Sequence, residues 1–469
     1  MNVQGHRPGW VALALLAGAM AWPLAAGAQA GFAANEVRQL TYADDVEPII
    51  RENCVTCHHP GTSAPMALET YDDVRRWSQR IRRAVETRAM PPGWYLDRTV
   101  GIQHFKNDPS LAPEDIRTIV DWVDQGTAMG DPSKVPPPIA WKAAHEYWEL
   151  EDDFGMGPPD LIITAPEYLV PAESGDQWFE PVAPINSLLD KPLTGGRWIR
   201  AMETRPSDQA SAYVFHHVNT SLIRPDQEDD DLDGGGLTDA AVGKRFDVYP
   251  EDSGKYVTPD DQLRFSLHLY PIGEEVTARL QLGIWLYPEG ERPKYATEDE
   301  RSHNSGESRS LGLPRYTDLL IPPNGYQELR AHFVLDRNVR VHSIRGHMHL
   351  RGGFQMMEAI YPDGRREVLN KIDWNHLWHT THVYEDWAQP LLPKGTVIVA
   401  TSLLDNTADN PSNPDPEQWV VYGRRSVSEM AHIRFGMTYI PDDDFEQMLV
   451  ERERILSERE RQPVPIASR

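Results

Sequence analysis

The sequence predicts a multidomain protein in which a small all-α domain precedes two all-β sandwich domains. Apolar residues recur at helical spacing between about Gln39 and Pro132. Beyond the proline-rich residues 134–160, short runs rich in Val, Ile and aromatic residues alternate with Gly, Pro and Asn or Asp breakers. At 469 residues, the chain also exceeds the usual length of one domain.

Residues 1–30 are typical of a secretory signal peptide. An apolar run from Val11 to Leu24 precedes the small residues Ala26–Ala30, which offer an Ala-x-Ala cleavage site. An uncleaved membrane anchor is the alternative, because the apolar run is nearly long enough to span a bilayer. Pro23 and the small-residue end favour cleavage. We therefore expect a periplasmic protein without stable membrane insertion.

Three helices are expected in residues 36–133. The first ends just before Cys54, and the second runs from Tyr71 to about Arg88. The third runs from Pro113 to Gln125 and stops at Gly126.

The sequence Cys54-Val55-Thr56-Cys57-His58 predicts covalent haem attachment. Two cysteines at this spacing can each add to a vinyl group of one haem, and the histidine can then ligate its iron. A redox dithiol is the alternative, but it needs no histidine and sits in a βαβ pattern that is absent here. Helices around such a motif resemble a class I cytochrome c. The resemblance implies one haem c and makes residues 36–133 a cytochrome c domain.

The second axial haem ligand should be a Met or His downstream of the attachment site. Met90 is favoured, because the two prolines that follow it stiffen its loop. Met66 and His104 are the alternatives. His59 adjoins the proximal ligand His58 and cannot reach the opposite face of the haem.

The later chain predicts two antiparallel sandwiches, residues 161–298 and 299–441, followed by a charged helical tail over residues 442–469. The clearest strand candidates are Leu161–Thr164, Trp198–Thr204, Tyr213–Ile223, Leu263–Leu269, Thr277–Tyr287, Val339–Ile344 and Thr396–Leu403.

Three groups of histidines occur in this β region, namely His216-His217, His268 and His347-Met348-His349. His347 and His349 share one face of a strand and can hold one metal ion. Imidazole suits copper, zinc and iron about equally, so the ligand type leaves the metal open. A single buried histidine is usually a hydrogen-bonded core residue, but three groups in one scaffold favour metal sites.

These histidines, followed by the pair Glu429-Met430, resemble the copper type II, ascorbate-dependent monooxygenases, such as peptidylglycine α-hydroxylating monooxygenase and dopamine β-monooxygenase. The resemblance covers residues 160–441. It implies two jelly-roll-like sandwiches, each carrying one copper ion. The implied electron-supplying site consists of His216, His217 and His268. The implied catalytic, dioxygen-binding site consists of His347, His349 and Met430. A thioether favours Cu(I), whereas zinc would not need it and has no redox chemistry.

The resemblance therefore implies a periplasmic copper-dependent monooxygenase that hydroxylates a C–H bond of a small organic substrate with dioxygen. The haem would pass on electrons from an external one-electron donor, such as a cytochrome, a quinol pathway or an ascorbate-like reductant. Two alternatives stay open. One is an electron-transfer or copper-binding protein without monooxygenase activity, and the other is a reductase acting on an inorganic substrate.

The same resemblance implies a substrate pocket at Arg345, His432 and Arg434. An ordinary salt bridge is an equal alternative for the arginines, because Arg pairs readily with carboxylates.

Two further features concern charge. The balance of 46 Lys and Arg against 71 Asp and Glu argues against nucleic acid as a partner. The segment Asp229–Gly234 matches the opening of a calcium loop, but its twelfth position is Ala240, which favours a solvated acidic insertion.

Overall fold

The computed structural model describes residues 38–62, 64–92, 96–106, 108–225, 236–241, 244–303, 319–378, 380–423 and 425–461. The predicted signal peptide and the acidic Asp229–Gly234 segment lie outside these residues. By contacts between residues, the chain divides into Met1–Gln39 and Leu40–Arg469, and everything below concerns the second unit. Within the described helices, none is long and apolar enough to cross a membrane.

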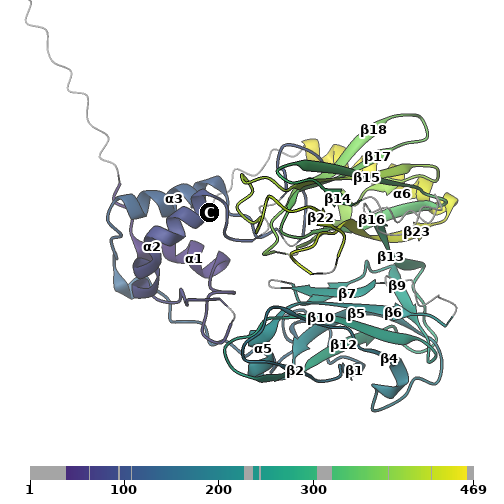
Figure 1. Ribbon diagram of the computed structural model, residues 1–469, viewed down its shortest axis with the longest axis horizontal. Coiled ribbons are helices and arrows are strands. Elements are labelled where there is room, and N and C mark those ends of the chain that lie inside the picture. Colours follow the sequence, from purple (N-terminus) through teal and green to yellow (C-terminus); the bar gives the residue numbers. More distant parts are fainter. Residues whose placement is uncertain are drawn as a thin grey trace, which may run out of the picture. The chain divides into compact units, whose positions relative to one another are not determined.

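A short helical region, Leu40–Gln125, opens this unit. Its helices are η1 (Tyr42–Val46), α1 (Glu47–Asn53), α2 (Tyr71–Glu86) and α3 (Pro113–Asp124) (Figure 1). Thr70 caps α2 by accepting from the Asp73 N–H, and Pro113 occupies the first position of α3. The predicted starts of these two helices are confirmed. Their apolar faces enclose a core around Tyr42, Ile119 and Trp122.

Strands dominate the rest of the chain. The first β region contains α4 (Glu149–Asp152), β1 (Leu161–Thr164), β2 (Tyr168–Val170), β3 (Gln177–Phe179), β4 (Val182–Pro184), β5 (Arg197–Pro206), α5 (Gln209–Val214), β6 (Phe215–Ile223), β7 (Gly236–Ala241), β8 (Phe246–Val248), β9 (Ser253–Val257), β10 (Gln262–Leu269), β11 (Val276–Ala278) and β12 (Leu280–Leu286). The second β region, entered through β13 (Tyr295–His303), contains β14 (Leu320–Ile321), β15 (Tyr326–Val334), β16 (Asn338–Met348), β17 (Gly352–Ile360), β18 (Arg366–Asp373), β19 (Thr381–Val383), β20 (Leu391–Leu392), β21 (Val397–Asp405), β22 (Val420–Val421), β23 (Ala431–Ile440) and α6 (Asp442–Arg461).

One ten-stranded sheet runs through both β regions, with the order β1-β12-β5-β9-β13-β23-β16-β19, β8 pairing with β5 and β20 with β16. The link is a parallel pair between β9 and β13, in which Tyr295 lies opposite Ser253. A five-stranded sheet belongs to the first region, with the order β3-β10-β6-β7 and β4 pairing with β10, and the four-stranded sheet β15-β21-β17-β18 belongs to the second. The expected boundary between residues 298 and 299 therefore falls inside β13.

The predicted fold class is wrong. Strands take 36% and helices 20% of the described residues, and the N-terminal helices form only a short region, not a small all-α cytochrome c domain. The contacts explain this result, because Leu40–Arg469 forms one unit and one sheet continues through both β regions. Helical periodicity predicted the individual helices, but it carries no information about what they pack against.

The segment Leu96–Lys106 ties the helical region to the second β region. Leu96 forms a bridge with Ile372, and Phe105 forms one with Tyr384. Both Leu96 and Phe105 are buried in the core of the second β region. Between them, Gly101 has a φ of +73°, and an added Cβ would lie 2.3 Å from the Leu369 carbonyl oxygen. This segment is thus part of the β structure, although it lies between α2 and α3 in sequence.

Replacing Phe105 by Ala tests that packing. Because Phe105 is 7% exposed and stacks on Tyr384 at 5.0 Å, its loss should lower the free energy of unfolding of the β structure by about 3–5 kcal/mol. Urea denaturation of the full chain, followed by circular dichroism, measures this change. Phe154→Ala is the control, since Phe154 is 59% exposed. Equal losses of unfolding free energy in the two variants would contradict the packing of Phe105 in this core.

Candidate metal centre

Three histidine side chains of the first β region converge. The Nδ1 atom of His216 lies 3.0 Å from Nδ1 of His217 and 3.3 Å from Nδ1 of His268. Across the residues that the structure describes, this is the only group of three or more His, Cys, Asp or Glu side chains that meets the spacing of a metal site, with ligand atoms within 4.8 Å of one another. Three imidazole nitrogens at this spacing fit one metal ion such as copper.

A break in the strand register explains how two adjacent histidines face one ion. His217 lies opposite His268, whereas Leu269 lies opposite Phe215, so His216 is an extra residue on β6. Successive side chains normally point to opposite faces of a sheet, and a bulge of this kind redirects one of them. The backbone irregularity therefore brings His216 to the same side as His217.

Burial keeps two of these imidazoles, those of His216 and His268, neutral. It lowers the pKa of His268 to about 4, assisted by the nearby His216 and opposed by Asp176. Burial also lowers the pKa of His216. Trp178 covers His268 with a stacked ring at 4.1 Å. Because a metal ion competes with protons for imidazole nitrogens, neutral rings at neutral pH are ready to bind it.

The second predicted ligand set lies where β16 ends and β23 begins. The rings of His347 and His349 have centroids 5.2 Å apart. The backbone N–H groups of His349 and Met430 both donate to the same oxygen of Glu429, so these two residues are neighbours. Glu429 is completely buried, and its burial raises the pKa of its carboxyl group to about 8. A copper ion held by these two imidazoles and the half-buried thioether of Met430 stays a prediction.

His432 lies opposite His347 in the strand pair β16–β23, and the two rings stack at 4.5 Å. Stacked rings lie face to face, so their nitrogens do not point at one common ion. His432 therefore packs against His347 and limits the orientations of that ring.

The predicted haem-attachment residues line a cavity of about 2530 Å³, together with the apolar side chains Ile81, Val85 and Pro91. Its wall includes Cys54, Cys57, His58 and Met90, as well as Met66. Nδ1 of His58 lies 3.0 Å from the Met66 carbonyl oxygen, which fixes the ring and directs Nε2 to the other side. Among the alternatives for the second axial ligand, His104 lies instead against Trp387, at 4.4 Å between ring centroids.

The cysteines do not have the character of a redox dithiol. Burial raises the pKa of both thiols, that of Cys54 to about 12. A reactive dithiol needs a lowered pKa. Neutral, half-buried thiols beside His58, with apolar side chains in the same cavity wall, would suit covalent haem attachment, which stays a prediction.

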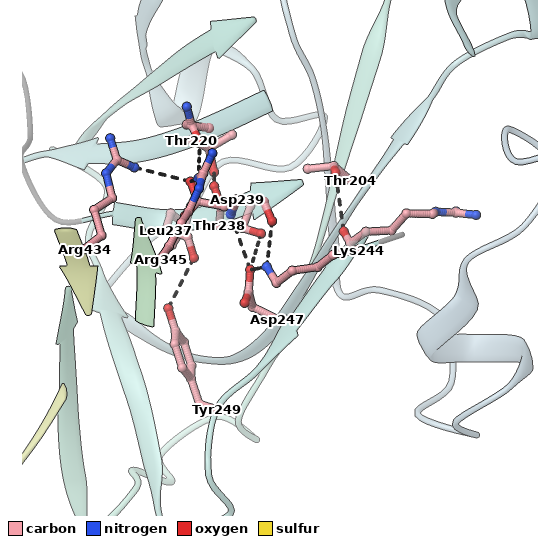
Figure 2. A network of polar contacts seen from close by, with 12 residues as sticks. Thr204, Thr220, Leu237, Thr238, Asp239, Lys244, Asp247, Tyr249, Arg345 and Arg434 are labelled. Atoms are coloured by element: carbon pink, nitrogen blue, oxygen red, sulfur yellow. Dashed lines mark hydrogen bonds and ion pairs between the residues drawn. The ribbon is translucent and has the colours of Figure 1, made fainter. Parts of the chain in front are cut away.

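The predicted substrate residues Arg345 and Arg434 meet a carboxylate of the first β region. Arg345 Nη1 lies 2.6 Å and Arg434 Nη1 3.3 Å from Oδ1 of Asp239 on β7 (Figure 2). Arg345 also donates to the Asn219 side chain at 2.7 Å. Burial by itself would raise the pKa of Asp239, but these arginines and Lys244 hold it far below its usual range.

The network continues through Lys244, which pairs with Asp247 at 2.7 Å, and through Thr238, which donates to the same carboxylate at 2.6 Å (Figure 2). All five charged residues line the large cavity, whose wall also includes His216 and His217. A salt bridge was the predicted alternative to substrate binding for the two arginines, and the structure contains this salt bridge. Asp239 itself carried no recognisable motif, so its role could not be predicted from the sequence.

Comparisons with known proteins identify no relatives. No family model and no curated protein matches the chain. A structure of infectious bursal disease virus, Gx strain, shares 11% identity over 66% of this chain and 90% of that chain, with a TM-score of 0.13. Procruciferin, an 11S globulin from Brassica napus, shares 7% identity over 60% of this chain and 84% of its own, with a TM-score of 0.11. At these scores the likeness carries no argument.

The ion pair at Asp239 makes a prediction about stability. Asp239→Ala should lower the free energy of unfolding by about 3–5 kcal/mol, because it leaves two largely buried guanidinium groups without their carboxylate. Urea denaturation of the full chain measures the loss. Glu451→Ala, which removes the exposed partner of Arg454 on α6, is the matched control and should change little. A loss of unfolding free energy no larger than that of the control would show that the ion pair does not stabilise the fold.

Proposed function

We propose that the protein is a periplasmic copper-dependent monooxygenase that hydroxylates a C–H bond of a small organic substrate with dioxygen. Electrons from an external one-electron donor would arrive through a haem c attached at Cys54 and Cys57. The observation that carries the proposal is the convergence of the His216, His217 and His268 nitrogens. The second ligand set, on strand ends of the same unit, supports it.

The first site is suited to passing single electrons. It offers three imidazole nitrogen ligands and no carboxylate among them, which favours copper over magnesium or calcium. A bound copper ion would supply one-electron chemistry by cycling between its two oxidation states. The chain fixes the rings of His217 and His268 opposite one another on paired strands, so their positions change little between those states.

The second site is suited to binding a reduced ion. Met430 brings a soft thioether, and Glu429 fixes the backbone of both His349 and Met430 from one side. The Trp374 indole holds the His349 carbonyl at 2.8 Å from the other side. These contacts fix the backbone of His349 and Met430 before any ion arrives.

The loop that follows the predicted haem-attachment motif contacts the helix that precedes the first site. The Gln209 side chain donates to the Gly61 carbonyl at 2.8 Å. Gln209 begins α5, whose end leads into Phe215 and His216. A haem held in the same chain would deliver electrons at a high effective concentration.

Replacing both His216 and His217 by Ala tests the metal content. The parent protein should bind two copper ions per haem, and the double variant should bind one, because the ligands at His347, His349 and Met430 remain. Elemental analysis after copper loading and dialysis gives the stoichiometry. Loss of both ions, or of neither, would contradict the assignment of two separate sites.

Met430→Ile tests the catalytic assignment. The substitution keeps an apolar side chain of similar bulk but removes the thioether, so folding and haem reduction should persist. Substrate-dependent oxygen uptake by the reduced, copper-loaded protein should fall by about 10–100-fold or more. Near-normal coupled turnover would exclude Met430 as a ligand. Copper binding by the parent without oxygen uptake on any candidate substrate would instead favour the electron-transfer alternative.

A further inference from the structure

The outer nitrogen of one first-site ligand binds a carboxylate. Because Nδ1 of His268 faces His216, its Nε2 points away from the cluster, and this atom lies 3.1 Å from Oδ2 of Asp176. Asp176 immediately precedes β3, which pairs with β10 and places Trp178 opposite His268. A histidine that donates its outer N–H to a carboxylate is held in the tautomer whose other nitrogen is available to a metal.

The same carboxylate oxygen reaches the second β region. Oδ2 of Asp176 accepts the Ser426 hydroxyl at 3.2 Å. Ser426 lies in a turn that the Ser428 N–H closes onto the Arg425 carbonyl at 2.9 Å. The Ser428 carbonyl oxygen lies 3.2 Å from Nδ1 of His349. A continuous series of polar contacts therefore connects His268 of the first ligand set with His349 of the second.

A second contact from the same region acts on the first site. The Leu377 carbonyl, in the loop between β18 and β19, accepts a hydrogen bond from the His216 ring. The second β region thus touches the surroundings of two of the three imidazoles of the first site.

We propose that Asp176 and Ser426 form a bridge that couples the two metal sites, so that an ion at one site raises the affinity of the other. An ion on His349 fixes that ring and the turn carrying Ser426. The turn positions Asp176, and Asp176 holds His268 in its metal-binding tautomer. By linkage, an ion at the first site must favour the second to the same extent. This inference rests on the proposed function in requiring that both sites bind copper.

The experiment compares copper affinities in full-length protein by competition with a Cu(I) chelator. The coupling factor is the affinity of the His216/His217/His268 site in a given background, divided by its affinity when His347→Ala and His349→Ala have removed the second site. In the parent protein this factor should be about 5–150. Ser426→Ala should reduce it to near one, because the contact between the turn and Asp176 is lost.

Variants of Asp176 separate charge from geometry. Asp176→Ala should weaken copper binding at the first site by about 10–100-fold and also abolish the coupling. Asp176→Asn keeps an oxygen that can accept from both partners, so it should retain the coupling while shifting the reduction potential of the first site. Ser174→Ala is the control, because the Ser174 hydroxyl bonds the Gly175 carbonyl within the same loop.

The outcomes separate a failure of the proposed bridge from a failure of the proposed function. A parent protein that binds no copper overturns both proposals. Two bound copper ions with a coupling factor of one in the parent, or with a factor unchanged by Ser426→Ala, overturn the bridge and leave the two-site assignment standing. An equal decrease of the coupling factor in Ser426→Ala and Ser174→Ala would attribute the decrease to the loops in general and would likewise overturn the bridge.

Discussion

The carboxylate of Asp239, held between Arg345 and Arg434, is the interaction on which the arrangement of the ligand sets depends. Side chains two residues apart on a strand share a face, so Arg345 lies on the face of His347, and Asn219 on the face of His217. Arg345 bonds both Asp239 and Asn219. The contacts that join the two β regions and the predicted metal ligands therefore occupy the same faces of the same strands.

Such an ion pair has a defined pH dependence. The folded-state pKa of Asp239 lies below its unfolded value, so its contribution to stability is fully present above the unfolded value of about 3.9 and disappears only as the pH falls through the lower, folded value. Burying charges is itself costly, and a buried pair adds less stability than its Coulomb energy suggests. The pair instead fixes how the strands lie, because one carboxylate can bind both arginines only when β7 lies against both β16 and β23.

The local features could be predicted from the sequence, whereas the long-range contacts could not. Helix starts at Tyr71 and Pro113 follow from capping residues and apolar spacing, which are properties of neighbouring residues. The histidine groups could be recognised because ligand types are rare and their order is distinctive. Leu96 and Phe105 gave no such sign, since nothing local separates a residue in a loop from one in a distant core. The bulge at His216 and the pairing of β13 with β9 likewise depend on partners far away in sequence.

These long-range contacts connect the loops around the predicted haem-attachment residues with both β regions. Gly61, just after the attachment motif, contacts Gln209 at the entrance to the first histidine set, whereas the segment that follows Met90 joins the second β region from Leu96 onward. The cavity wall that includes Cys57 and His58 also includes His216 and His217. A haem attached at Cys54 and Cys57 would therefore lie in the same cavity as His216 and His217. Among the described residues, the cavity wall includes His216 and His217 but neither His347 nor His349, which favours the first set as the electron-supplying site.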